Sequence, residues 1–233
     1  GADAGDGAIA MTAIKDIKKR NMKAFYSAMK AYLLPPAQLA EEAKKLEAAG
    51  LDEYTIMDSA GTMLPDQAAA YTEALADALS IPVAFHCHNN LGLSAANALA
   101  AWQNGAAILD CGLMGMARSA GNLATEVCVA LMQRHGEMKD IDLFGMLDFI
   151  ENRLQPAMAA HNYHNPISPT DLTLGYSGCH SSFLKLFKKA AAEKGVNLFR
   201  LITEVSAANQ KNPSEELIAQ TADRLIKAQK EEA

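Results

Sequence analysis

Two histidines at the end of one apolar run have the clearest capacity for chemistry in this sequence. The run "VAFHCH" covers residues 83–88 and ends in His86 and His88. Successive side chains of a strand point to opposite faces, so both imidazoles are expected on one face and Cys87 on the other. Two neutral imidazoles on one face can supply half of a metal site, or they can be hydrogen-bonded structural histidines.

Four further polar residues stand where the chain is expected to leave a strand or begin a helix. Asp58 and Ser59 end the run "YTIMDS" and are expected to face the same edge as the histidines, unless they serve the following turn. Asn122 precedes a helical run, where it can cap the helix or offer its carbonyl oxygen to a hard cation. The spacing around His180 indicates only a residue at the start of a helix.

The elements that must position these residues alternate between strand and helix. Short apolar runs predict strands at 23–29, 52–59, 83–88 and 106–113. Helical spacing, with prolines at the starts of two segments and glycines at several ends, predicts helices at 7–20, 36–50, 65–79, 94–105 and 122–136.

Four consecutive strand–helix units predict an α/β fold with a parallel sheet. Either an open doubly wound sheet or part of a (β/α)₈ TIM barrel fits this pattern. No G-x-G-x-x-G motif follows a strand, which disfavours a dinucleotide-binding sheet. In a parallel barrel, His86 and His88 would lie at the carboxyl-terminal mouth of the strands.

The pattern changes after Gly136, and we interpret the chain as two parts, residues 1–136 and 137–233. Helices are predicted at 142–160, 181–195 and 213–230. Residues 161–178 are predicted to be a polar connection, in which His161 and His164 are solvated. The second part is therefore expected to be a helical C-terminal region.

The composition of the chain limits which binding partners and which cellular location are expected. The net charge of −6 argues against nucleic acid as the main partner. No apolar stretch approaches the roughly 18–20 residues of a membrane helix, so no membrane partner is expected. The four cysteines show no C-x-x-C spacing, which favours reduced thiols and a cytoplasmic location.

The stretch from "FHCHNNLG" to "AGNLATEV" resembles the metal-dependent lyases and synthases built on (β/α)₈ barrels. That superfamily includes 4-hydroxy-2-oxovalerate aldolases, hydroxymethylglutaryl-CoA lyases and isopropylmalate synthases. The segments "DSAGTMLP" and "LGYSGCHSSFLKLFKKAAAEKGV" look most like the aldolase branch. The cysteine-bearing loop of the hydroxymethylglutaryl-CoA lyases has no counterpart in "GLMGMARSAGN", which disfavours that branch.

The resemblance implies a divalent-metal-dependent pyruvate aldolase that cleaves 4-hydroxy-2-oxo acids to pyruvate and an aldehyde. It implies that His86 and His88 bind Mn²⁺ or Mg²⁺, with Asn122 near the metal. Asp58 and Ser59, from their place at a strand end, are expected to bind the 2-oxo acid substrate. His180 stands where the family has a tyrosine, and a histidine can also transfer a proton.

The resemblance also implies partners, and two other functions stay open. In the aldolase family the helical tail docks an acylating aldehyde dehydrogenase. The family takes a metal-binding aspartate and an arginine from its first strand, so we expect an oligomer or a complementing N-terminal segment to supply them. The alternatives are an acyl-CoA condensing synthase on the same barrel and a non-catalytic binding or assembly module.

Overall fold

A five-stranded parallel sheet forms the first part of the molecule, with strands in the order β1-β2-β3-β4-β5. The computed structural model describes residues 1–161, 163 and 169–231. The strands are β1 (Ala2–Asp3), β2 (Phe25–Met29), β3 (Glu53–Asp58), β4 (Val83–Cys87) and β5 (Ile108–Asp110). The predicted α/β fold with a parallel sheet is confirmed, and the opening residues of the chain contribute a short strand of their own.

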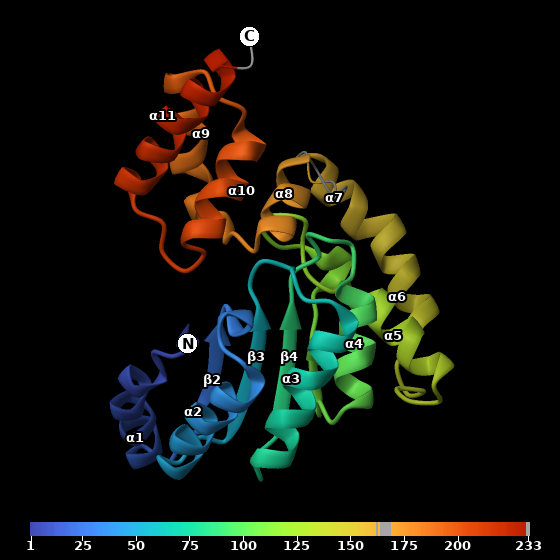
Figure 1. The fold of residues 1–233 in the computed structure, drawn as a ribbon. Helices are drawn as coiled ribbons and strands as arrows, with labels where there is room; N and C mark the ends of the chain where they lie inside the picture. The colour runs from blue at the N-terminus through green and yellow to red at the C-terminus, as the bar shows by residue number, and fades with distance from the viewer. Residues whose placement is uncertain (162, 164–168, 232–233) are drawn as a thin grey trace.

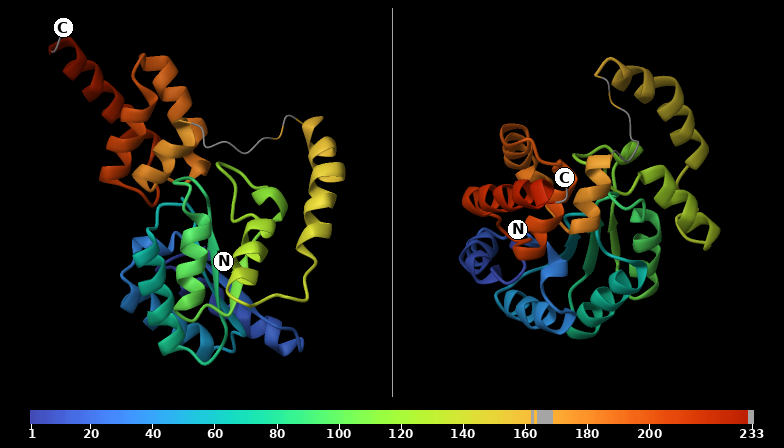
Figure 2. Two further views of the ribbon diagram at one scale, coloured as in Figure 1. Left: turned by 90° about the vertical axis from the view of Figure 1, so that its right-hand side faces the viewer. Right: turned by 45° about the horizontal axis from the view of Figure 1, so that its top comes forward.

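The helices that connect the strands lie along one side of the sheet (Figures 1 and 2). They are η1 (Gly7–Ala10), α1 (Met11–Lys19), α2 (Pro36–Ala48), α3 (Pro65–Ala78), α4 (Ser94–Gln103) and α5 (Thr125–Arg134). Alternate strand residues such as Tyr54, Ile56 and Phe85 are buried on the helix-facing side. This burial forms one apolar core that runs from Ala2 to Met132.

The opposite face of the sheet is more open among the described residues. Phe25 and Ile108, on β2 and β5, are 61% and 38% exposed. A strand side chain that alternates away from the helices needs another layer to cover it. The sheet therefore has the curvature and helix arrangement of part of a barrel, with its inner face partly exposed (Figure 2).

In the C-terminal part, helices α8 to α11 lie beyond the carboxyl ends of β3 and β4, where their arrows point in Figure 1, whereas α6 lies beside α5. The elements are α6 (Leu143–Phe149), the π-turn η4 (Ile150–Leu154), α7 (Gln155–Ala159), α8 (Pro169–Ser177), η5 (Ser181–Phe183), α9 (Leu184–Lys194), α10 (Leu198–Ala208) and α11 (Glu215–Glu231). Leu174, Phe187, Leu201 and Val205 belong to a second core.

Two helices in this region were not predicted. Part of the expected polar connection is α8, whose Leu174 is fully buried, while residues 162 and 164–168 of that connection lie outside the described part of the chain. The helix α10 begins at Leu198, and the side chain of Asn197 before it accepts hydrogen bonds from the amides of Phe199 and Arg200. β-branched residues lower helix propensity, and burial in the second core outweighs that penalty.

The helix predicted at 142–160 is interrupted by a π-turn that ends at Leu154, two residues before Pro156. Proline has no N–H to donate, so the regular hydrogen-bond ladder cannot continue through it. None of the described helices is long and apolar enough to cross a membrane. The predicted division of the chain at residue 136 stays a prediction.

Candidate functional site

His86 and His88 lie at the carboxyl end of β4, as the spacing predicts. Their ring centroids are 5.5 Å apart and the rings meet edge to face. The backbone of Asn122 pairs with that of His88 in an isolated antiparallel bridge, which brings a residue 34 positions later to the same place. Three of the predicted site residues therefore converge at one strand end.

Two buried atoms in this group have no hydrogen-bond partner among the described residues. They are Nδ1 of His88 and Oδ1 of Asn122. An unpartnered buried acceptor is costly unless a ligand, an ion or water satisfies it. Burial, followed by the neighbouring His86 and Arg118, lowers the pKa of His88 to about 4. The imidazole is therefore neutral at pH 7 and has a lone pair to offer a cation.

The imidazole of His86 is held by a residue that sequence reasoning missed. Nδ1 of His86 lies 2.7 Å from Oδ2 of Asp110, at the end of the neighbouring strand β5. The register pairs His86 with Asp110, so both side chains share the open face of the sheet. The hydrogen bond from His86 lowers the pKa of Asp110. A carboxylate on Nδ1 leaves Nε2 as the free ligand atom.

His180 reaches the same region from the C-terminal part, at the start of η5. Its Nε2 lies 2.9 Å from Nη2 of Arg118, and its Nδ1 lies 2.8 Å from the hydroxyl of Ser182. Burial, and then the charges of Arg118 and Lys30, lower the pKa of His180 to about 4. A neutral, oriented imidazole can accept a proton at pH 7.

Asp58 and Ser59 make contacts within the fold. Asp58 pairs in register with Cys87, which places it on the helix-facing side, away from His86. Its carboxylate accepts hydrogen bonds from the amides of Thr62 and Met63, at 3.0 Å each. Burial raises the pKa of Asp58 to about 6, against the lowering effect of these amides. These contacts match the alternative in which Asp58 stabilises the turn after β3. Substrate binding by Asp58 stays a prediction.

Ser59 accepts a hydrogen bond from the backbone amide of Lys30, at 2.9 Å. Lys30 follows β2 in a left-handed conformation, with φ of 55°. Its ammonium contacts Asp3 at 3.0 Å and the carbonyl of Lys211 at 2.7 Å. Ser59 thus helps to hold a buried lysine beside the site, and its own contact with substrate also stays a prediction.

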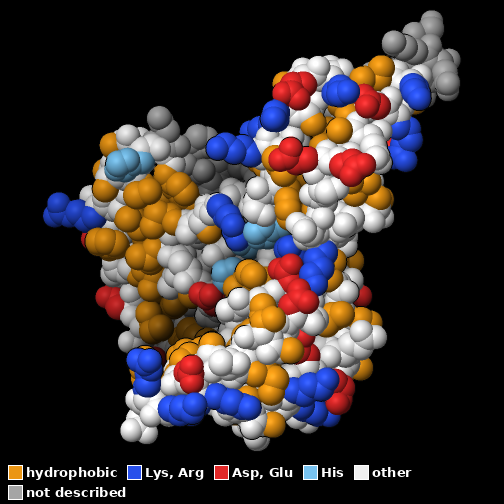
Figure 3. Space-filling model, turned by 90° about the vertical axis from the view of Figure 1, so that its left-hand side faces the viewer, with side chains coloured by type: hydrophobic (Ala, Val, Ile, Leu, Met, Phe, Trp, Pro, Cys, Tyr) orange, Lys and Arg blue, Asp and Glu red, His pale blue; other side chains and the backbone are white. Residues whose placement is uncertain are grey.

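The site lies in a hollow between the strand ends and the C-terminal helices. Figure 3 shows histidine side chains in this hollow, with lysine or arginine side chains next to them. A cavity of about 680 Å³ also runs past Asn122 between α4, α5 and α7. An assembly of bases and cations at strand ends, open to solvent, is suited to binding an anionic small molecule.

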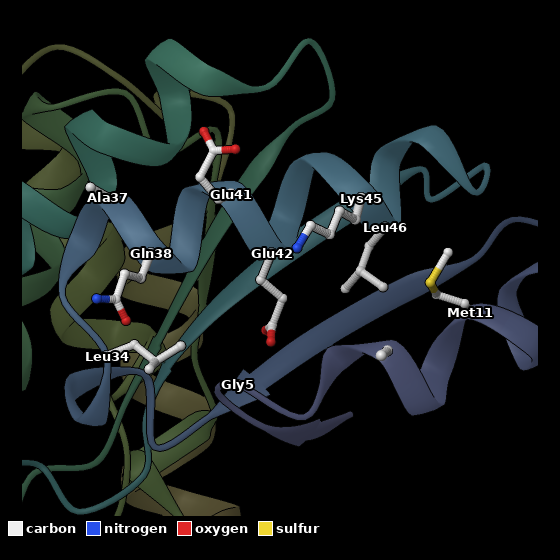
Figure 4. A pocket seen from close by; sticks show the side chains of 10 residues that line it. Gly5, Met11, Leu34, Ala37, Gln38, Glu41, Glu42, Lys45 and Leu46 are labelled. Carbon is white, nitrogen blue, oxygen red and sulfur yellow. The ribbon is translucent and has the colours of Figure 1, made fainter.

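A separate cavity of about 510 Å³ lies between η1 and α2, away from these residues (Figure 4). Glu42 points from α2 toward the chain near Gly5, and its carboxylate accepts a hydrogen bond from the amide of Gly7 at 3.1 Å. The lining is mostly aliphatic and contains no histidine. This cavity therefore lacks the groups that the strand-end site brings together.

The structure places His86, His88, Asn122 and His180 in one region, while exposed His161 lies elsewhere in the chain and His164 lies outside the described residues. Sequence reasoning missed Asp110 and Arg118. Asp110 lies within the predicted strand 106–113 and ends the observed strand β5, so the rule that selected His86 could have found it once the end of that strand was known. No periodic signal marks Arg118, which lies in an irregular loop.

Comparison with protein families gives two matches. The HMGL-like family matches residues 7–151. A DmpG-like communication domain matches residues 166–227.

Individual proteins agree with these families. The 4-hydroxy-2-oxovalerate aldolase of Chloroflexus aurantiacus is 42% identical over 178 residues, which cover 76% of this chain and 51% of the relative. The 4-hydroxy-2-oxovalerate aldolase of Carboxydothermus hydrogenoformans is 35% identical over 218 residues, 94% of this chain and 64% of the relative. The chain thus spans about half to two thirds of the length of these relatives.

Solved structures share the fold. The carboxyl transferase domain of Rhizobium etli pyruvate carboxylase has a TM-score of 0.75 at 17% identity, covering 98% of this chain and 42% of that one. A putative aldolase domain from Bacteroides vulgatus has a TM-score of 0.67 at 22% identity, covering 78% of this chain and 60% of that one. At these identities the likeness concerns the fold alone.

Proposed function

This chain belongs to the HMGL-like family, and on that premise we propose that it acts as a divalent-metal-dependent pyruvate aldolase. The reaction cleaves a 4-hydroxy-2-oxo acid, of the 4-hydroxy-2-oxovalerate type, to pyruvate and an aldehyde. Relatives named 4-hydroxy-2-oxovalerate aldolase, at 35–42% identity, support the reaction class. A location in the cytoplasm is part of the proposal.

The observation that carries the proposal is the arrangement of His86, His88 and Asn122. They lie together at the end of β4 and include two buried polar atoms without a hydrogen-bond partner in the part of the chain that the structure describes. Nδ1 of His88 and Oδ1 of Asn122 have no partner among the described residues. No group of three His, Cys, Asp or Glu that could hold a metal occurs in the described part of the chain. Two imidazoles and one amide oxygen fit a cation that takes its other ligands as oxygen atoms from elsewhere.

We assign Mn²⁺ or Mg²⁺ to this site, because both accept a coordination shell rich in oxygen. When bound, the cation acts as a Lewis acid on the 2-oxo group of the substrate. His86 would bind through Nε2, since Asp110 occupies its Nδ1. The carboxylate that the resemblance expects from a first barrel strand stays a prediction.

His180 is the proposed proton acceptor. Its Nε2 takes the proton of the C4 hydroxyl, the C3–C4 bond breaks, and the C4 oxygen becomes the carbonyl of the departing aldehyde. The electron pair of the broken bond moves into the 2-oxo half, and protonation at C3 then gives pyruvate. The low pKa of His180, due first to burial, keeps this base unprotonated at neutral pH.

The activity is tested by replacing His86 and His88 with alanine, one at a time. Both variants should lose binding of Mn²⁺ in calorimetry and lose lyase turnover, while circular dichroism stays near wild type. His161→Ala, which removes an exposed histidine, is the matched control and should keep both properties. Metal binding and turnover that survive in both variants would exclude the assignment. Metal binding without turnover in the wild type, once a segment that supplies the expected aspartate and arginine is present, would favour the non-catalytic alternative.

His180→Tyr tests the role of the tail residue. If position 180 performs the proton transfer of the family tyrosine, the variant should retain or increase activity on 4-hydroxy-2-oxo acids. An inactive but folded His180→Tyr protein would mean that this histidine has a role of its own, which Arg118 beside it would help to define.

We further propose that the C-terminal helices dock an acylating aldehyde dehydrogenase that receives the aldehyde. The match of residues 166–227 to a DmpG-like communication domain supports this proposal. Phe199 on α10 is 40% exposed and offers an apolar contact. Sedimentation of the mixture should show a complex that Phe199→Asp weakens, whereas Lys188→Asp on α9 leaves it intact. Independent sedimentation of the two wild-type proteins would contradict the proposal.

A further inference from the structure

Arg118 lies in a loop that is tied firmly to the end of β4. The amide of Asn89 donates to the carbonyl of Gly121 at 2.8 Å, and the amide of Ala120 donates to Oδ1 of Asn90 at 3.3 Å. Within the loop, the amide of Gly121 donates to the carbonyl of Arg118 at 3.2 Å. These bonds hold the backbone of Arg118 at the strand end where the histidines lie.

The guanidinium of Arg118 covers the atom that the proposed reaction needs. Nη2 of Arg118 lies 2.9 Å from Nε2 of His180. Arginine has only donors, so Nε2 must be the acceptor and carries no proton. Nδ1 lies 2.8 Å from the Ser182 hydroxyl and also accepts a longer contact, of 3.3 Å, from the Ser182 amide. A neutral ring accepts at one nitrogen only, and the 2.9 Å bond from the charged guanidinium is the stronger of the two, so the ring proton is assigned to Nδ1 and faces the hydroxyl. Arg118 therefore occupies the lone pair that would accept the C4 hydroxyl proton.

Arg118 also takes part in none of the ion pairs between described residues, so its guanidinium has no carboxylate partner among them. Lys30, the other cation beside His180, differs because Asp3 and the carbonyl of Lys211 already hold its ammonium. A guanidinium binds a carboxylate through two parallel hydrogen bonds, which are much stronger than one bond to a neutral imidazole. A ligand carboxylate should therefore displace His180 from Arg118.

The position of Arg118 indicates which end of the substrate carries that carboxylate. In the proposed function the metal side, with His86 and His88, holds the 2-oxo acid half, and His180 acts at the C4 hydroxyl. Arg118 contacts the Nε2 atom that would face the C4 hydroxyl, so in the proposed function its guanidinium would lie beside C4 and within reach of a group on that carbon.

We infer that Arg118 selects 4-hydroxy-2-oxo acids with a second carboxylate next to C4, an inference that rests on the proposed function. Cleavage of such a five-carbon diacid gives pyruvate and glyoxylate, an aldehyde that carries a carboxylate. Binding of the second carboxylate turns Arg118 away from His180 and frees Nε2 to accept the proton. The selection of substrate and the activation of the base are then one event.

The test compares two ligands that differ only at their last carbon, 2-oxopentanedioate and 2-oxopentanoate. Calorimetry on the Mg²⁺-loaded protein should show about tenfold tighter binding of the diacid, as expected when a charge-assisted bidentate pair is gained. Arg118→Gln should bind both ligands with equal affinity. Arg134→Gln, which removes an exposed arginine on α5, should keep the preference. In ¹⁵N spectra of the wild type, only the diacid should shift Nε2 of His180.

The outcomes separate this inference from the proposed function. Equal binding of both ligands to the wild type, or a preference that persists in Arg118→Gln, overturns the inference and leaves the aldolase proposal intact. Equal weakening of both ligands in Arg118→Gln would place Arg118 at the shared 2-oxo acid end and also overturns it. A folded, Mg²⁺-loaded wild type that binds neither ligand overturns the inference together with the proposed function.

Discussion

The imidazole of His86 is oriented by the carboxylate of Asp110, 24 residues later in the chain. This hydrogen bond can be removed while both histidines of the site remain. Asp110→Asn keeps the size of the side chain but removes the charge that favours a proton on Nδ1. We expect Mn²⁺ affinity to fall by about 10–100-fold, the usual effect of losing such an outer ligand partner. Calorimetry measures the affinity, and ¹⁵N spectra of the metal-free protein should show a changed His86 tautomer.

Asp77→Asn on α3 provides the matched control, because Asp77 is exposed and lies outside the site. It should leave both the affinity and the tautomer of His86 as in the wild type. An Asp110→Asn protein with unchanged spectra and affinity would show that the 2.7 Å contact does not orient His86.

The pKa of His180 leads to a prediction about stability. Burial and the neighbouring cations lower this pKa to about 4 in the folded protein, below the ordinary value of 6.5. The folded state then binds fewer protons than the unfolded chain between these values, so the free energy of unfolding falls as pH decreases from 6.5 to 4. His180→Gln should reduce this loss by about 1–3 kcal/mol, and exposed His161→Gln should not. Urea unfolding at several pH values measures the difference.

At the scale of elements, the turn between β3 and α3 sets the position of His88. Gly61 has φ of 60°, and a Cβ there would lie 2.6 Å from the carbonyl oxygen of His88 and 2.7 Å from the amide of Asn90. Both neighbours are backbone atoms that cannot move aside alone. This close approach explains why the turn after Asp58 contains glycine.

Gly61→Ala should therefore lower the free energy of unfolding by more than the same substitution at a glycine that has only a positive φ. Gly195, after α9, is the control, because its φ is 67° but a Cβ would meet nothing within 4 Å. We expect Gly195→Ala to cost about 1 kcal/mol and Gly61→Ala about 3 kcal/mol or more, with weaker Mn²⁺ binding only in the latter. Equal costs in urea unfolding would argue against the steric contact.

At the scale of the whole molecule, a few polar contacts join the two cores. The hydroxyl of Tyr32 donates to the carbonyl of Gly178 at 3.2 Å. Lys211 donates to Asp6 at 2.7 Å, and its carbonyl accepts from Lys30 at 2.7 Å. These bonds place η5, and with it His180, over the strand ends.

The double variant Tyr32→Phe with Lys211→Met should loosen this connection. The chain has one tryptophan, Trp102 on α4, which reports on the first core, whereas circular dichroism reports on all helices. We expect the two unfolding transitions to separate in urea, because each core then opens more independently. Lys194→Met, which breaks the exposed contact with Asp223 inside the C-terminal part, should leave the transitions coincident. Coincident transitions in the double variant would contradict the coupling.

The sequence by itself determined the features that depend on local periodicity. The strands and helices of the first part follow from apolar spacing, and the shared face of His86 and His88 follows from the alternation of a strand. The motifs around these histidines also led to the family that the comparisons confirm. The roles of the site residues stay predictions.

Only the tertiary structure decided which distant residues meet. Asp110 reaches His86 through strand register, and Arg118 reaches His180, 62 residues later, because a second core docks over the first. The position of Asp58 on the helix-facing side of the sheet likewise depends on its pairing with Cys87. Helix α8 forms because Leu174 is buried in the second core. Each of these features is stabilised by contacts between separate segments, which no local spacing encodes.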